Sequence, residues 1–175
     1  VNQLLIERLP LTTELALYNL EANVEPLELA GRCFSELRTR VQDLVTEARR
    51  AAAEVGTEIV LTGILPTLSK SDVTLANITP RTRYYALNEA FARARAGEPY
   101  KLRIQGSDEL YTEHDSVMLE SCNTSFQVHL QVDPDEFAQL YNIAQAVTAP
   151  VMAAAVNSPV LFGRQLWKET RIALF

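Results

Sequence analysis

In residues 14–25, ELALYNLEANVE, the side chains at 16, 18, 20, 22 and 24 are apolar, and from residue 19 on they alternate with polar ones. A period of two predicts a strand with one face turned toward a core. The opposite face is unusually polar and consists of Asn19, Glu21, Asn23 and Glu25. This strand therefore offers two carboxylates on one face, with amides beside them.

A second stretch with the same alternation covers residues 125–132, SFQVHLQV. Its polar face places His129 between Gln127 and Gln131, which makes a row of hydrogen-bonding side chains. We expect the polar faces of the two alternating strands to line one concavity.

Three segments are predicted helices, over residues 27–55, 79–96 and 133–156. The first and third repeat apolar residues every three or four positions, the spacing of an amphipathic helix, and the second has a proline in its first turn. A glycine follows each of the first two, and the tripeptide NSP at 157–159 ends the third. Pro150 is expected to kink or split the third helix, because proline lacks an N–H group and clashes with the preceding turn.

The remaining stretches have weaker patterns. Residues 57–65, rich in β-branched side chains, and residues 100–106 are predicted strands. Residues 106–115 are predicted to form a polar loop in which His114 is solvated, and residues 116–120 are too short to assign.

Long helices between amphipathic strands favour an α+β fold, with an antiparallel or mixed sheet and the helices packed on one side. A length of 175 residues without repeats or linkers predicts a single domain over residues 1–175. The chain starts at Val1, and its last residues, 171–175, lack a polar tail. We interpret it as a fragment of a longer catalytic domain.

Composition narrows the classes of partner. Sixteen Lys and Arg against 22 Asp and Glu give a net charge of −6, which argues against nucleic acid or an anionic membrane as partner. No apolar run reaches the length of about 18 residues that predicts a membrane span. Cys33 and Cys122 form neither a disulfide framework nor a zinc set. We therefore expect a cytoplasmic location, and the oligomeric state is left open.

The polar strand faces are the first candidate site. Carboxylates such as Glu21 and Glu25 suit Mg²⁺ or Mn²⁺, and the imidazole of His129 can complete such a set. The alternative is that these side chains form the solvated faces of an antiparallel sheet.

Arginines are the second candidate. Arg83 lies among tyrosines at a predicted helix start, and Arg164, Lys168 and Arg171 follow the NSP tripeptide. A guanidinium binds carboxylate or phosphate through two parallel hydrogen bonds. Surface ion pairing is the alternative, which we prefer for Arg164 and Lys168. The sequence contains no GxxxxGK[ST], GxGxxG, GxSxG or HExxH motif, so a Walker-type phosphate loop is excluded.

The stretch SFQVHLQVDPDEFAQLYNIAQAVTAPVMAAAVNSPVLFG resembles the family-2 glutamate-cysteine ligases and related carboxylate-amine ligases. Its shared features are a QVH strand, an acidic helix start, a helix ending in P-x-x-x-A, and NSP. LEANVEP, GILP and TPRTRYYAL occur in the family's order and at about its spacing. The resemblance covers nearly the whole chain and is weakest over residues 97–120.

The resemblance implies a catalytic domain similar to glutamine synthetase, with an antiparallel sheet curved into a funnel. It implies that ATP phosphorylates the γ-carboxylate of glutamate and that the amine of cysteine displaces phosphate, giving γ-glutamylcysteine, the first step of glutathione synthesis. Glu21, with Glu25, would bind Mg²⁺ or Mn²⁺, and His129 would contact the metal or the phosphates of ATP. Arg171 would face a substrate carboxylate or the transferred phosphate. Arg83 would contact the nucleotide or only anchor its helix.

The chain also departs from the family pattern. The first acidic motif, E-x-E, is absent, and so are the later glutamate- and nucleotide-binding segments. We therefore expect the fragment to be inactive without its flanking segments. Two alternatives stay open: a related ligase that uses another amine, and a ligase-like binding module that has lost its chemistry. Loss of Glu21, His129 or Arg171 would favour the module, and none of them is lost.

Overall fold

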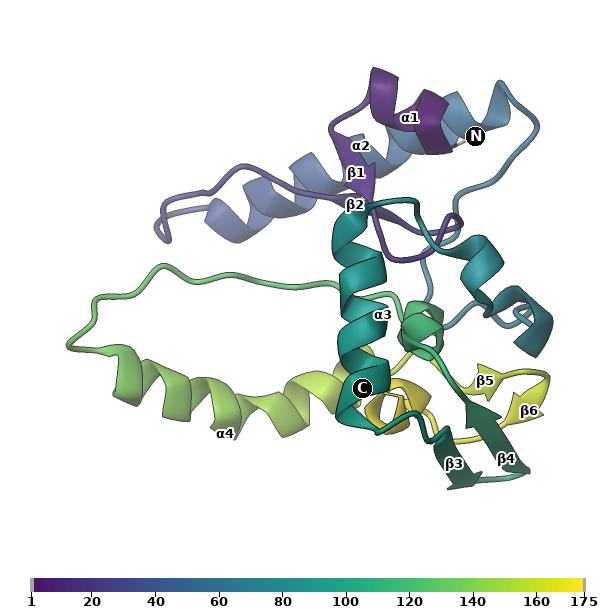
Figure 1. Cartoon of the computed structure of the whole chain (residues 1–175). Helices are drawn as coiled ribbons and strands as arrows, with labels where there is room; N and C mark the ends of the chain where they lie inside the picture. The colour runs from purple at the N-terminus through teal and green to yellow at the C-terminus, as the bar shows by residue number, and fades with distance from the viewer. Residues whose placement is uncertain (1, 175) are drawn as a thin grey trace. The chain divides into compact units, whose positions relative to one another are not determined.

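A computed structural model describes residues 2–174, in which helices combine with small antiparallel sheets (Figure 1). The fold is therefore α+β, as predicted. The sheets formed within these residues are two-stranded pairs, β1 with β2, β3 with β4, and β5 with β6. The larger curved sheet that the resemblance implies is not formed by the described residues. No helix among them is long and apolar enough to cross a membrane.

The backbone divides into two compact units, which are described separately. The first unit comprises Val1–Leu61, Asp72–Glu98 and Asp115–Ser121, and the second comprises Thr62–Ser71, Pro99–His114 and Cys122–Phe175.

The first unit contains α1 (Asn2–Arg8), α2 (Cys33–Ala53) and α3 (Thr82–Ala94), with β1 (Leu11–Thr13) paired to β2 (Leu20–Ala22). Its α1 and α2 helices bury Leu5, Ala51 and Ala52 in a common cluster. Short 3₁₀ turns at Lys70–Asp72, Leu75–Asn77 and Val117–Cys122 join the larger elements of the chain.

The predicted helix over residues 27–55 begins later than expected, at Cys33. Gly31 has a φ of 56°, in the left-handed region, so the helix cannot extend through it toward Pro26. At the other end Gly56 has a φ of 67° and stops the helix, as predicted. The second predicted helix is confirmed as α3.

The second unit contains the hairpin of β3 (Tyr100–Gln105) and β4 (Glu109–His114), the pair β5 (Val160–Leu161) and β6 (Arg164–Gln165), and the helix α4 (Phe137–Ala155). A 3₁₀ turn at Thr170–Ala173 follows β6.

The prediction of a polar loop at 106–115 is wrong, because β4 occupies most of it. Leu110, Thr112 and His114 form the buried face of this strand. Two of these three side chains are polar, so the sequence does not show the alternation of apolar and polar residues by which a strand is predicted. The expected solvation of His114 is also wrong, since its side chain is buried.

Three predicted strands are shorter than expected or absent. In the stretch 14–25 the ladder is confined to β2, and Ala16 makes an isolated bridge with Ile78. Residues 57–65 form no strand beyond a bridge at Ile64. Residues 125–132 have no ladder partner within the described part of the chain. Alternation indicates which faces a strand could have, but a strand forms only where a neighbour supplies hydrogen bonds.

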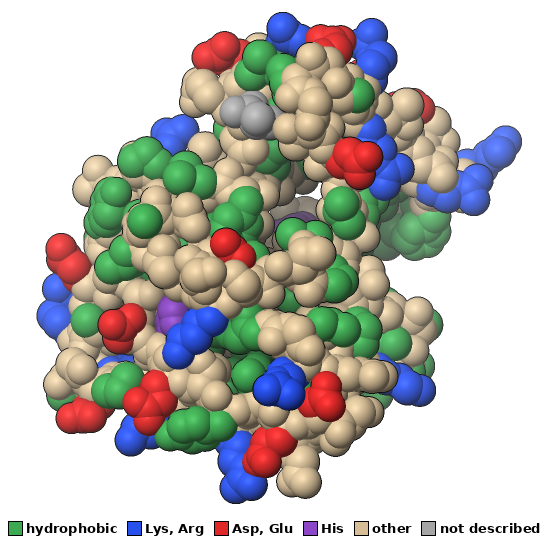
Figure 2. Space-filling view, turned by 90° about the vertical axis from the view of Figure 1, so that its right-hand side faces the viewer, with side chains coloured by type: hydrophobic (Ala, Val, Ile, Leu, Met, Phe, Trp, Pro, Cys, Tyr) green, Lys and Arg blue, Asp and Glu red, His purple; other side chains and the backbone are tan. Residues whose placement is uncertain are grey.

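The third predicted helix is confirmed as α4, but Pro150 does not split it. The carbonyl of Ala146, which loses its partner at Pro150, belongs to an exposed residue and can bind water. Most apolar side chains of α4 and of 125–132 are exposed, as Phe126 and Phe137 illustrate. On the face shown in Figure 2, hydrophobic side chains likewise lie in the surface, and basic side chains are interspersed with acidic ones.

Candidate functional site

The NSP tripeptide lies beside the segment that carries Arg171, within the second unit. Ser158 and Glu169 form a parallel bridge, in which Ser158 N donates to Lys168 O at 3.2 Å and Thr170 N donates to Ser158 O at 3.2 Å. Ser158 and Thr170 are fully buried. Backbone pairing therefore fixes the position of Glu169 next to the tripeptide.

The Glu169 carboxylate accepts four hydrogen bonds. Arg171 Nε donates to Oε1 and Nη2 donates to Oε2, each at 2.6 Å. Ser158 Oγ donates to Oε1, and the backbone N–H of Asn157 donates to Oε2 at 3.3 Å. The guanidinium, followed by the serine hydroxyl, lowers the pKa of Glu169 from 4.5 to about 2 although burial opposes the shift. Glu169 is only 6% exposed and stays ionised at neutral pH.

Arg171 is held on a second side by the backbone. Its Nη1 donates to Thr124 O at 2.7 Å, and its own N–H donates to Ser158 Oγ at 3.3 Å. The hydrogen bond to Glu169 raises the pKa of Arg171 further above its ordinary value. A guanidinium has five N–H bonds, and the three contacts use one each on Nε, Nη1 and Nη2. One N–H therefore remains on each terminal nitrogen, on a side chain that is 25% exposed.

Gly63, the glycine of GILP, lets the backbone pass directly beneath this guanidinium. A Cβ at this position would lie 2.7 Å from Asn157 O and 2.9 Å from Arg171 Nε. Gly63 N donates to Asn157 O at 3.0 Å, and Thr124 N donates to Gly63 O at 2.9 Å. GILP and NSP, nearly a hundred residues apart in sequence, therefore pack against the same arginine.

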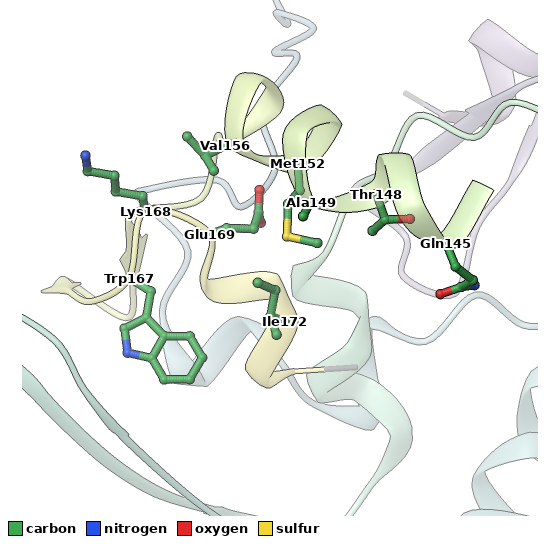
Figure 3. A pocket seen from close by; sticks show the side chains of 10 residues that line it. Gln145, Thr148, Ala149, Met152, Val156, Trp167, Lys168, Glu169 and Ile172 are labelled. Carbon is green, nitrogen blue, oxygen red and sulfur yellow. The ribbon is translucent and has the colours of Figure 1, made fainter. Parts of the chain in front are cut away.

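An open hollow of about 510 Å³ lies between the last turns of α4 and the segment that carries Glu169. Figure 3 shows Trp167 and Ile172 on one side of it and Thr148 and Met152 on the other. Its lining is mainly apolar, and Glu169 is its carboxylate, already bound by Arg171.

The predicted metal ligands are divided between the two units. Glu21 lies in β2 and accepts a hydrogen bond from Asn23 at 3.5 Å, and Glu25 lies at the surface after this strand. His129 belongs to the second unit, where its ring contacts Gln127 at 3.3 Å. Within residues 2–174 no group of three or more His, Cys, Asp or Glu side chains could hold a metal ion.

Arg83 contacts the residue that follows it. Its Nη2 donates to Tyr84 Oη, and its guanidinium carbon lies 4.5 Å from the centre of the Tyr84 ring. Tyr84 is buried, and its hydroxyl donates to Thr13 O at 3.1 Å. Tyr84 thus anchors α3 to β1, and Arg83 itself stays at the surface.

Sequence reasoning identified Arg171 and NSP but missed Glu169. Arg171 lies in the 3₁₀ turn that begins just after Glu169, so the pairing of the two side chains follows from this turn and from the bridge to Ser158, and no periodic pattern in the sequence indicates it. Arg164 and Lys168 are exposed, as expected for surface cations.

Comparison with known proteins supports the resemblance. The model of glutamate-cysteine ligase family 2 matches residues 2–175. Two proteins described as "Glutamate--cysteine ligase EgtA", from Mycobacterium tuberculosis strains CDC 1551 / Oshkosh and ATCC 25618 / H37Rv, are each 30% identical to this chain over 125 residues. The aligned part is 70% of this chain and 24% of each relative, so the chain spans about a quarter of their length. The comparison with solved structures gives no significant match. The chain belongs to glutamate-cysteine ligase family 2.

Proposed function

We propose that the protein is an ATP-dependent carboxylate-amine ligase that joins glutamate to cysteine. The γ-phosphoryl group of ATP passes to the γ-carboxylate of glutamate, releasing ADP. The amine nitrogen of cysteine then bonds to the acyl carbon, the C–O bond to phosphate breaks, and the amine loses a proton. Family membership and the name of the mycobacterial relatives support this reaction.

The observation that carries the proposal is that the Arg171 guanidinium is fixed in place and still has N–H bonds to donate. Two of its N–H bonds are left over after Glu169 and Thr124 have fixed the guanidinium, one on each terminal nitrogen. Such a pair can bind two oxygens of a carboxylate or a phosphoryl group. Phosphoryl transfer to a carboxylate gathers several negative charges, which cationic groups must stabilise. We assign this role to Arg171.

The proposal includes Mg²⁺ or Mn²⁺, with Glu21 and Glu25 as carboxylate ligands and His129 as a ligand or a contact to the phosphates of ATP. When bound, the metal would neutralise phosphate charge. Arg83 is proposed as a nucleotide contact. The described residues do not themselves gather three such ligands.

The whole protein is proposed to have a catalytic fold similar to glutamine synthetase, to which this chain contributes part of the sheet and its covering helices. The exposed alternating stretch 125–132 supports this assignment, because a segment with regular alternation and no pairing partner among the described residues is suited to join a larger sheet. Its substrates are proposed to be the small molecules glutamate, cysteine and ATP.

The test is a ligase assay on the protein expressed from its complete reading frame. ADP and γ-glutamylcysteine are measured with ATP, Mg²⁺, glutamate and cysteine, and with each substrate omitted in turn. We expect equal amounts of both products only when all substrates are present. ADP formation with a different amine would identify a related ligase. If no amine supports ADP formation, the proposal is contradicted and a binding module is favoured.

A further inference from the structure

We infer that Glu169 and Ser158 are positioning residues that hold the Arg171 guanidinium in one orientation for the reaction. The inference rests on the proposed function, because it concerns how Arg171 is presented to a substrate. It adds two residues that act through the arginine and do not themselves touch the substrate.

The carboxylate of Glu169 is held in place by the NSP segment, and it can therefore hold Arg171. Each of its two oxygens accepts one bond from the guanidinium and one from the NSP segment, through Ser158 Oγ and Asn157 N. A carboxylate held at both oxygens cannot rotate without breaking hydrogen bonds. Its plane therefore sets the plane of the guanidinium.

Ser158 connects the two charged groups. Its hydroxyl donates to Glu169 and accepts the backbone N–H of Arg171 at 3.3 Å. Because Ser158 is fully buried, removal of its hydroxyl would leave the Arg171 N–H unsatisfied and would cost Glu169 Oε1 one of its hydrogen bonds. The serine thus sets the distance between the carboxylate and the arginine backbone.

One further hydrogen bond limits the motion of the guanidinium. Thr124 O accepts from Nη1, and the lack of a Cβ at Gly63 leaves space for Nε and Cζ, which an added Cβ would meet at 2.9 and 3.0 Å. Arginine side chains lose conformational freedom when they bind an anion, which weakens binding. A guanidinium held in advance avoids much of this cost in the transition state.

The test is chemical rescue of Arg171→Ala by free guanidinium, in protein from the complete reading frame. Glu169 would bind the added guanidinium in place of the missing side chain. We expect guanidinium to raise the kcat of Arg171→Ala at least tenfold, and to raise the kcat of the double variant Arg171→Ala, Glu169→Gln less than twofold. Equal rescue in both would overturn the positioning role while leaving the role of Arg171 intact.

Single variants give a second measurement. We expect Glu169→Gln to lower kcat at least tenfold, and Ser158→Ala to lower it by a smaller factor because the ion pair stays. The matched control is Glu109→Gln, which breaks an exposed ion pair with Arg103 in the same unit and should change kcat less than twofold. Unchanged kcat in Glu169→Gln would contradict the inference.

A third readout does not depend on activity. Nitrogen-15 NMR of the Arg171 side chain reports rotation about its Nε–Cζ bond. We expect slow rotation with separate Nη signals in the wild type, and faster rotation in Glu169→Gln. Fast rotation in the wild type would overturn the positioning role whatever the ligase assay shows. Absence of ligase activity together with slow rotation would instead count against the proposed function alone.

Discussion

The buried carboxylate of Glu169 links the stability of the site to pH. Glu169→Gln removes the charge paired with Arg171 and keeps the size of the side chain. The pKa of Glu169 is lowered from 4.5 to about 2, chiefly by the hydrogen bonds from Arg171. This lowering corresponds to about 3 kcal/mol, by which ionised Glu169 stabilises the folded protein more than protonated Glu169 does.

The sign follows from the direction of the shift. Because the pKa is lower in the folded protein, the contribution is complete well above the unfolded value of 4.5 and is lost as pH falls toward about 2. Linkage with these two pKa values gives a loss of about 2 kcal/mol between pH 6 and pH 3. Glu169→Gln has no carboxyl to titrate and lacks this loss.

The assay is urea denaturation at pH 6 and at pH 3, followed by the fluorescence of Trp167, two residues from Glu169. We expect the wild type to lose about 2 kcal/mol more than Glu169→Gln between these pH values. Glu109→Gln removes an exposed carboxylate and is the matched control, which should follow the wild type. Equal losses in the wild type and Glu169→Gln would refute the reasoning.

Three further variants or probes test the packing. Gly63→Ala should lower the free energy of unfolding by about 1–3 kcal/mol, because its Cβ would meet Asn157 O and the Arg171 side chain; an unchanged urea midpoint would show that the contact relaxes freely. Tyr84→Phe should lower it by about 1 kcal/mol through loss of the bond to Thr13 O, and no change would remove Tyr84 as an anchor. Burial raises the pKa of Cys122 to about 12, so iodoacetamide at pH 8 should alkylate it far more slowly in the folded than in the unfolded protein, as mass spectrometry would show; equal rates would contradict its burial.

Helices were predictable because their signals are local. The spacing of apolar residues and the glycines beyond the ends identify α2 and α3, and Gly31 explains the late start of α2. Pro150 does not split α4, because one lost hydrogen bond on an exposed helix leaves a carbonyl that water can satisfy.

Strands were less predictable, because their partners lie elsewhere in the chain. The alternation over 125–132 is regular, yet no neighbour pairs with it within the described residues. Conversely, β4 carries Thr112 and His114 on its buried face, so hydrophobicity alone does not show its period.

The candidate site was only partly predictable, because its residues also contact partners that lie elsewhere in the chain. The motif order indicated Arg171 and NSP, but the contact between Ser158 and Glu169 depends on a backbone pairing that no local pattern encodes. The role of Arg171 stays a prediction, and so do those of Glu21, Glu25, His129 and Arg83, which metal and nucleotide titrations of the corresponding variants can examine.

The central claim is that Arg171 stabilises the charge that develops as the acyl phosphate forms. Its most direct test is the steady-state kcat of Arg171→Lys and Arg164→Lys with ATP, glutamate and cysteine, with thermal stability checked in parallel. An ammonium cannot reproduce the two-point contact of a guanidinium, so Arg171→Lys should lower kcat on the order of a hundredfold. Arg164→Lys, at an exposed position, should stay within about twofold of the wild type. Near-wild-type rates for both variants would contradict the account.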